Sequence, residues 1–340
     1  MRISARSVLV ATLLACASCS GPADYPDKDI TVVIPFNSGG AFDAYVRALA
    51  PGLQKHLPNS INVLPKNLPG AGGRRGASDI YRSRPDGYTI GIFNMPGVLI
   101  PQLQGMTIGY ELSKVTWLAT LGYDHYVFVV KGDSPYKSID DLQKLGRNIT
   151  YGATGPGSTS FVATNIVNET LGIPFDIITG YKGSAGYLLG LIRGDFDAAM
   201  INYSTARTYL ESGDIKALAV FGIESSDPEI ADASDLGAPE LGHIRVVRMM
   251  GAPPGLPDDI KTMLEQALLG AMQDADFQSW LKSTGNEAHP ASATETAAAV
   301  TSGSRRRASS TAARRRAEAD RGSAPAPRRA GAGVPAPRCT

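Results

Sequence analysis

Residues 30–49 read ITVVIPFNSGGAFDAYVRAL. The β-branched run Ile30–Ile34 predicts a strand, and the apolar spacing after the two glycines predicts a helix over Ala41–Lys55. Because the first N–H groups of a helix have no partner within it, the turn at residues 37–40 directs them at one point. Such a point suits a carboxylate or a phosphate. The segment therefore predicts a strand, a glycine turn and an anion-binding helix start.

The body of the chain repeats this alternation of strands and helices. Further strands are expected at residues 61–64, 88–93, 126–131, 148–151, 175–178, 198–201, 217–220 and 244–250. Helices are expected at residues 76–83, after a capping Ser138, and at 158–171, 184–193, 204–212 and 257–275. This alternation is typical of an α/β fold with mostly parallel sheets and helices on both faces.

A second glycine-rich turn, Tyr151-Gly-Ala-Thr-Gly-Pro-Gly-Ser158, also opens a helix. Two anion-pointing helix starts far apart in the chain imply two lobes with a cleft between them. We expect residues 24–123 and 221–302 to form the first lobe and residues 124–220 the second, with the strand at 217–220 crossing back. Two crossings give two hinge strands, an arrangement that closes on a ligand.

The first residues have the pattern of an export signal. A short basic head precedes the apolar run Val8–Ala15, which is too short for a permanent membrane helix. Residues 1–19 therefore read as a lipoprotein-type signal, with Cys16 as the lipidated residue and Cys19 as the alternative; a simply cleaved signal is the other reading. Only Cys339 follows, so we expect no internal disulfide and no cysteine metal site.

The last segment, residues 303–340, differs from the rest in composition. It holds ten arginines against two acidic residues and has no lysine or aromatic residue, so disorder is expected. The abrupt change after residues 297–300 suggests a shifted reading frame. Arginine blocks also bind nucleic acid, but an exported protein has little access to it, and no nucleic-acid partner is expected.

The charge balance constrains how an anion is held. The whole chain has a net charge of +1, and because the tail is strongly basic the rest is acidic overall. An acidic body that binds an anion must rely on local dipoles and hydrogen bonds. We therefore expect that no lysine or arginine needs to enter the pocket, and that Lys182 is solvated.

Several motifs recur in one order along the chain. They are Tyr25-Pro26, Val33-Ile-Pro-Phe36 followed by Gly39-Gly40-x-x-Asp43 and Arg47, Asn67-x-Pro-Gly-Ala-Gly-Gly73, Pro85-Asp-Gly-Tyr-Thr89, Gly152-x-x-Gly155-x-Gly-Ser158, Tyr181-Lys-Gly183, Gly194-x-x-Asp197 and Ala252-Pro253-x-Gly255-x-Pro257. In this order the chain resembles the substrate-binding proteins of tripartite tricarboxylate transporters, the Bug or TctC-like family, from the start of the body to about Val300.

The resemblance implies a two-lobed periplasmic-binding-protein fold of the type II kind. It implies an extracytoplasmic receptor, monomeric and without cofactor or metal, that clamps a small organic carboxylate and passes it to a membrane permease. The loops at residues 37–43 and 154–160 would hold the carboxylate. The candidate ligand-binding residues are Asn37, Ser38, Gly39, Gly40, Ala41, Phe42, Asp43, Asn94, Met95, Thr154, Gly157, Ser158, Thr159, Gly183 and Asn202.

Some of these residues have a purely structural alternative. Asp43 lies in a first helical turn, where an acid favours the helix dipole without touching a ligand. Phe42 could narrow the pocket, stack on a ligand or simply pack. Asn94 and Met95 follow a strand end, where ligands gather in α/β folds, and Asn202 ends another strand. Arg47 is expected to form a structural ion pair.

Two other functions stay open, a same-fold receptor that signals to a membrane sensor without transport, and, more remotely, a hydrolase. The four histidines are scattered, and the glycine turns match neither a Walker motif nor a nucleophile elbow, so we expect no enzyme. Members of the family end with a helix that follows a segment of the type Thr294-Glu295-Thr296-Ala297-Ala298 and packs on the first lobe. We expect the arginine tail to replace that helix.

Overall fold

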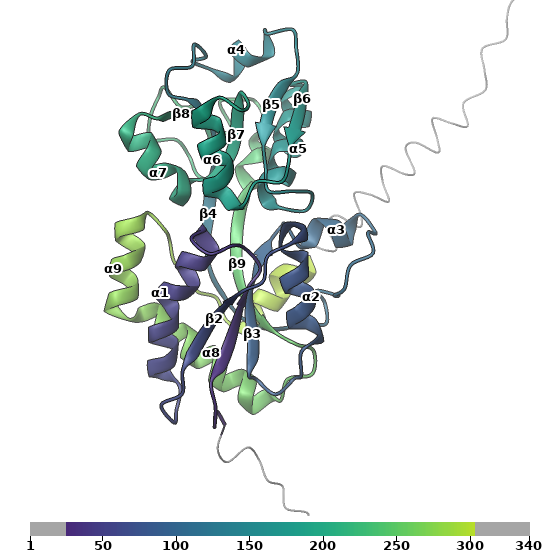
Figure 1. Cartoon of the computed structure of the whole chain (residues 1–340), viewed down its shortest axis with the longest axis vertical. Coiled ribbons are helices and arrows are strands. Elements are labelled where there is room, and N and C mark those ends of the chain that lie inside the picture. Colours follow the sequence, from purple (N-terminus) through teal and green to yellow (C-terminus); the bar gives the residue numbers. More distant parts are fainter. Residues whose placement is uncertain (1–24, 303–340) are drawn as a thin grey trace, which may run out of the picture.

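A nine-stranded sheet runs through the two lobes of the molecule (Figure 1). The computed structural model describes residues 25–302, so the expected signal, Cys16, Cys19 and the arginine tail lie outside the described residues. The strand order is β2-β1-β3-β9-β4-β7-β5-β6, with β8 on the other side of β4. None of the helices within residues 25–302 has the length and apolar character needed to cross a membrane.

The first lobe is built on the expected opening unit. Its strands are β1 (Ile30–Ile34), β2 (Val63–Asn67), β3 (Thr89–Met95) and β9 (Arg245–Ala252), and its helices are α1 (Ala41–His56), α2 (Arg74–Arg82), α3 (Leu99–Leu103), α8 (Asp258–Gln273) and α9 (Ala275–Thr284), with the 3-10 turn η1 (Ala71–Gly73). Strands β1, β2 and β3 pair in parallel.

The second lobe repeats the pattern. Its strands are β5 (Ile149–Gly152), β6 (Phe175–Ile178), β7 (Ala198–Asn202) and β8 (Ile215–Phe221), and its helices are α4 (Ile139–Gln143), α5 (Thr159–Leu171), α6 (Gly183–Arg193) and α7 (Tyr203–Ser212). Strands β5, β6 and β7 pair in parallel. The 3-10 turn η2 (Pro239–His243) precedes β9.

The strand β4 (Thr116–Lys131) joins the lobes and is ten residues longer at its start than the expected strand at 126–131. Up to His125 it pairs with β9, and from Tyr126 it pairs with β7 and β8. All these ladders are antiparallel, so the sheets are parallel only away from the hinge. The early part of β4 is buried on both faces, which hides the alternation that marks a strand in sequence.

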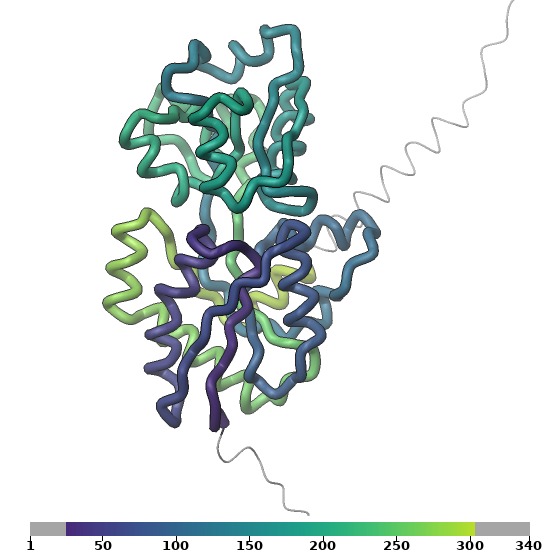
Figure 2. The backbone as a smooth tube through the Cα atoms, in the orientation of Figure 1, coloured from purple at the N-terminus to yellow at the C-terminus, as the bar shows by residue number. Residues whose placement is uncertain are grey.

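The return to the first lobe also differs from expectation. Strand β8 pairs along the second half of β4 and stays in the second lobe, so the prediction that 217–220 crosses back is wrong. The chain returns through residues 222–244 and enters β9, where Arg245 lies opposite His125. Figure 2 shows these two connections, β4 and the run into β9, side by side between the lobes.

The expected replacement of the family's final helix by the arginine tail falls on residues outside those that the structure describes. Residues 293–302 form a helix, and its Val300 is buried in the apolar cluster of the first lobe that contains Phe93 and Trp117. Thr296 also bonds Thr120 on β4 through their hydroxyls, 2.9 Å apart. The segment at residues 293–302 is therefore helical and packs on the first lobe.

Candidate functional site

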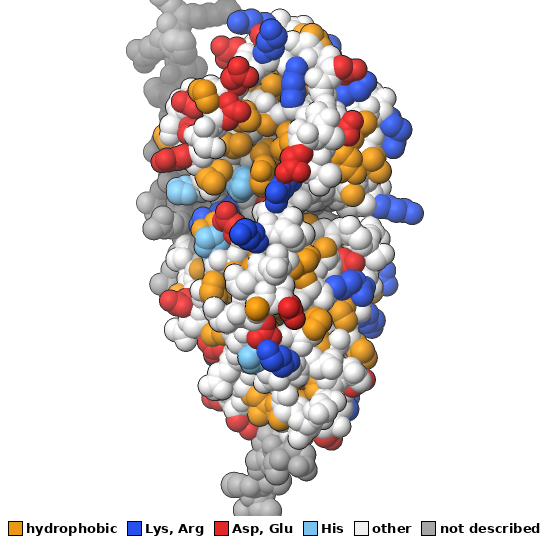
Figure 3. Space-filling view, turned by 90° about the vertical axis from the view of Figure 1, so that its left-hand side faces the viewer, with side chains coloured by type: hydrophobic (Ala, Val, Ile, Leu, Met, Phe, Trp, Pro, Cys, Tyr) orange, Lys and Arg blue, Asp and Glu red, His pale blue; other side chains and the backbone are white. Residues whose placement is uncertain are grey.

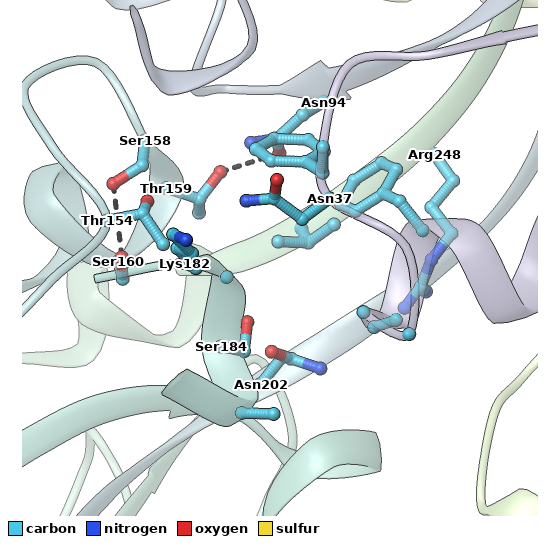
Figure 4. Close-up of a pocket in the computed structure, with 18 of the residues that line it drawn as sticks. Asn37, Asn94, Thr154, Ser158, Thr159, Ser160, Lys182, Ser184, Asn202 and Arg248 are labelled. Carbon is cyan, nitrogen blue, oxygen red and sulfur yellow. Dashed lines mark hydrogen bonds between the residues drawn. The ribbon is translucent and has the colours of Figure 1, made fainter. Parts of the chain in front are cut away.

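A pocket lies between the lobes, beside the start of α1 and the start of α5 (Figure 4). Its cavity volume is about 90 Å³, against roughly 150 Å³ for an engineered cavity that holds benzene. The cavity therefore suits a small ligand. The pocket is lined by Phe36, Asn37, Ser38, Gly39, Gly40, Ala41, Phe42, Asn94, Tyr126, Thr154, Ser158, Thr159, Ser160, Lys182, Gly183, Ser184, Ala185, Asn202, Val246 and Arg248.

The first wall is the turn that leads into α1. Gly40 is the N-cap and offers no side-chain cap, so the N–H groups of the first turn are available on the pocket side. Gly39 has φ of 79°, which favours glycine. Gly40 is extended at φ −86°, and an added Cβ would meet only the Asn37 carbonyl oxygen at 3.5 Å. Glycine is therefore required at position 39 but not at position 40.

Asp43 serves this turn and does not line the pocket. Its carboxylate accepts hydrogen bonds from the Gly39 N–H at 2.8 Å, from Arg47 Nε at 2.8 Å and from Asn67 Nδ2 at 2.9 Å. Burial raises the pKa of the Asp43 carboxyl, but these hydrogen bonds outweigh burial and hold that pKa below its ordinary value. The expected ion pair of Arg47 is confirmed. The structural reading of Asp43 is thus the one the geometry favours.

The second wall is the start of α5. Ser158 is its N-cap and accepts from the Phe161 N–H at 3.3 Å, and its hydroxyl lies 3.1 Å from that of Ser160. The Thr159 hydroxyl donates to Asn94 Oδ1 at 2.6 Å, which links the second lobe to the end of β3 in the first. Both helix starts therefore face the same cavity, one from each lobe.

The lobes also touch beside the pocket. A Cβ added to Gly72 would lie 2.7 Å from the Ser158 backbone nitrogen, and one added to Gly97 would lie 2.9 Å from the Gly157 oxygen. The backbones of the two lobes are thus in direct contact at these glycines. The cleft between the lobes is therefore closed.

The floor of the pocket is a buried polar network at the hinge. Arg248 on β9 has no exposed surface, and its Nη2 donates to Asp124 on β4 at 3.0 Å. Asp124 also accepts from Asn202 Nδ2 at 3.1 Å and from the backbone and hydroxyl of Ser204. The network therefore ties the strand shared by both lobes to a strand of the first lobe and to the end of β7 in the second.

The pocket lining carries cationic but no anionic side chains. The two cations are Lys182 and Arg248. The sequence argument that no lysine or arginine needs to enter the pocket did not anticipate this lining, whereas the exposure of Lys182 agrees with the solvated position expected for it. Lys182 is exposed at the pocket edge, where it precedes α6. Charged side chains of both signs are spread over the face of the molecule shown in Figure 3.

The structure brings most of the predicted site residues together. All of them line the pocket except Asp43, Met95 and Gly157. Met95 follows Asn94 on one strand, and because successive side chains of a strand face opposite sides, it enters the core instead. Gly157 has φ of 87° and contacts the first lobe beside the pocket.

Sequence reasoning missed part of the lining, namely Phe36, Tyr126, Ser160, Lys182, Ser184, Ala185, Val246 and Arg248. Ser160 and Ser184 adjoin predicted residues and were within reach of the motifs. Val246 and Arg248 share one face of β9 by the two-residue period of a strand. That β9 passes under the pocket depends on the strand order, which no local pattern encodes.

The described residues offer little for metal chemistry. Within residues 25–302, no group of three or more histidine, cysteine, aspartate or glutamate side chains is arranged to hold a metal ion. The pocket lining contains no histidine. His125 and His289 instead stack on Tyr203 and Tyr123 near the hinge, at ring distances of 4.6 Å and 3.6 Å. The two helix starts and the polar side chains that line the pocket are suited to holding an anion.

The chain is similar to known proteins over most of its length. A family model described as tripartite tricarboxylate transporter family receptor matches residues 45–312. A UPF0065 protein of Bordetella pertussis is 26% identical over 288 residues, which cover 83% of this chain and 88% of the relative. Protein BugT of the same organism is 27% identical over 284 residues, covering 80% and 86%.

Solved structures share the fold. The periplasmic binding protein BugD superposes with a TM-score of 0.73 at 25% identity and covers 84% of this chain and 97% of its own. MatC from Rhodopseudomonas palustris, solved with bound malate, has a TM-score of 0.74 at 22% identity and covers 83% and 98%. These likenesses confirm the expected two-lobed periplasmic-binding architecture.

Proposed function

The chain belongs to the family of tripartite tricarboxylate transporter receptors, and on that premise we propose that it clamps a small organic carboxylate outside the cytoplasm and delivers it to a membrane permease. As a member of this family it is a solute-binding protein. The choice of a carboxylate, the permease partner, a monomeric state and anchoring through a lipidated Cys16 or Cys19 are parts of the proposal.

The observation that carries the proposal is the convergence of two helix starts on one pocket with two cations and no carboxylate. Helix starts favour anions, and hydrogen bonds to a charged group contribute about 1.5–3 kcal/mol each. Four such bonds total about 6–12 kcal/mol before the entropic cost of association is subtracted, and a dissociation constant near 1 μM corresponds to about −8 kcal/mol, so four or more bonds are needed. The pocket requires no metal or cofactor to do this.

We assign the grip on the carboxylate to backbone N–H groups at the start of α1 and to the polar side chains of the opposite wall. The wall residues are Ser158, Thr159 and Lys182, with Asn37 and Asn94 at the junction of the lobes. The lobes proposed from sequence, residues 24–123 with 221–302 and residues 124–220, place one helix start in each. Closure around the ligand then uses the hinge between His125 and Tyr126, where β4 changes partners.

Thermal shift and calorimetry with a panel of carboxylates test this proposal. The panel includes malate and adipate, because proteins of the same fold were solved with them. We expect at least one acid to raise the melting temperature and to bind near or below about 10 μM. A protein that binds none of the panel contradicts the proposal.

A matched pair of variants at one position tests the role of the α1 start. In Gly40→Ala the added Cβ meets the Asn37 oxygen at 3.5 Å, an ordinary contact, so binding should stay within about threefold of wild type. In Gly40→Trp the indole fills the pocket, and binding should fall at least about 100-fold. Equal affinities of the two variants would show that the ligand does not use this turn.

A further inference from the structure

Arg248 is a buried cation whose hydrogen bonds are incomplete. Only its Nη2 has a protein partner, Asp124, while Nε and Nη1 are buried without any. Leaving buried donors of a charged group unpaired is costly, and such groups in native structures need an explanation. Because the same side chain lines the pocket, a ligand atom is the natural missing partner.

Phe42 stands where the pocket meets this cation. Its ring lines the pocket and lies 5.5 Å from the Arg248 guanidinium, with the Tyr45 ring at 4.9 Å on the same group. Phe42 also packs on Phe36 at a ring distance of 4.8 Å. Phe42 therefore borders both the pocket and the guanidinium whose Nε and Nη1 are unpaired.

The two ends of the pocket are chemically distinct. Ser158, Thr159 and Ser160 lie on one side in Figure 4, and Arg248 lies on the other, beside the start of α1. The first end offers a helix start and the Lys182 ammonium, and the second offers a guanidinium held in place by Asp124. A ligand that spans the pocket therefore meets a cationic group at both ends.

We propose that Arg248 is a specificity-determining residue that binds a second oxyanion of the ligand, and that Phe42 covers this subsite until the ligand enters. The inference rests on the proposed function, since it concerns the far end of the same ligand. A charge-assisted hydrogen bond from Nε or Nη1 then replaces the missing partner. Asp124 fixes the guanidinium from its other side, so the cation is positioned before the ligand arrives.

The test compares acids of equal length that differ by one carboxylate. Calorimetry with succinate against butyrate, glutarate against valerate, and adipate against hexanoate gives the preference for the diacid at each length. We expect the wild type to prefer the best diacid over its monoacid at least about tenfold. Equal affinity for the two members of every pair overturns the inference while leaving the proposed function intact, whereas no binding of any acid overturns both.

Variants test whether the diacid preference comes from the charge of Arg248 or only from the packing of side chains around the pocket. The double variant Asp124→Asn with Arg248→Gln removes the cation without stranding a charge, and it should lower the diacid preference to within about threefold. Arg147→Gln, which removes an arginine paired with Asp197 far from the pocket, should leave the preference unchanged. A double variant that folds, as judged by circular dichroism, and keeps the wild-type preference overturns the inference.

Phe42→Ala gives a second test that does not depend on the network folding without its charges. Uncovering Arg248 should raise the affinity for the diacid at least about threefold at some chain length. Loss of the apolar ring alone would weaken the monoacid, whose far end is a methyl group, without strengthening the diacid, so the covering role requires that the diacid itself binds more tightly. A diacid affinity that does not rise at any of the three lengths therefore contradicts the covering role of Phe42 and the subsite behind it.

Discussion

At the scale of single residues, the sequence predicted that Asp43 could reach the ligand and did not single out Arg248, but Arg248 lines the pocket and Asp43 does not. Asp43 lies in the motif of the glycine turn, yet its carboxylate accepts hydrogen bonds from Gly39, Arg47 and Asn67 within the first lobe. Arg248 belongs to no motif, yet it reaches the pocket floor. Spacing predicted which turn lines the pocket, whereas the direction of each side chain depends on partners that only the assembled lobes bring near.

Asp43→Asn should expose the structural role of this carboxylate. The variant weakens the bonds to the Gly39 N–H and to Arg47, so we expect its free energy of unfolding to fall by about 1–2 kcal/mol at pH 7. Because the turn at Gly39 is held less firmly in the variant, the ligand affinity should also fall, by less than about tenfold. Urea unfolding measures the first effect and calorimetry the second. A loss of ligand affinity without any loss of stability would instead place Asp43 on the ligand.

The pH dependence has a definite sign. Because the folded-state pKa of Asp43 is lowered, its carboxylate stabilises the fold above the unfolded-state value of about 3.9, and this stability is lost as the pH falls through the folded pKa. The melting temperature of the wild type should therefore drop more between about pH 5 and pH 3 than that of Asp43→Asn. Asp79→Asn, an exposed position on α2, should follow the wild-type curve.

At the scale of elements, the two helix starts were predictable and the hinge was not. Glycine turns and a serine cap are local signals, and they gave both walls of the pocket. The length of β4 and the course of β8 depend on which strands pair across the lobes. Both faces of β4 are covered, so its sequence lacks the alternation of apolar and polar residues by which a strand is usually recognised.

The contribution of the helix at residues 293–302 to stability can be tested at Val300. Val300 is 3% exposed and packs in the first lobe, whereas its neighbour Ala299 is exposed. Val300→Asp loses about 1.5–3 kcal/mol of apolar burial and adds the cost of a buried charge. We expect a clear fall in the urea midpoint for Val300→Asp and almost none for Ala299→Asp. Equal midpoints would mean that this helix does not contribute to stability.

At the scale of the whole molecule, the proposed function requires that the lobes meet around the ligand. The contact is made by backbone on both sides, at Gly72 against the turn of α5 and at Gly97 against Gly157. The hydrogen bond from Thr159 to Asn94 crosses the same junction. Sequence motifs marked the glycine turn at Gly72, but the partner of each turn follows from the closed arrangement of two lobes that are far apart in the chain.

Gly97→Ala tests this junction. The added Cβ would lie 2.7 Å from Asn94 Nδ2 and 2.9 Å from the Gly157 oxygen, both too close, so the closed arrangement must shift. Because the steric conflict with Gly157 exists only when the lobes touch, the open form is less affected. We expect about a tenfold loss of carboxylate affinity, a change in stability below about 1 kcal/mol, and a larger radius of gyration with ligand by small-angle X-ray scattering. Gly242→Ala, whose Cβ would have its nearest neighbour at 3.8 Å, should behave as wild type. If Gly97→Ala binds and compacts as the wild type does, ligand binding does not require the lobes to meet at this junction.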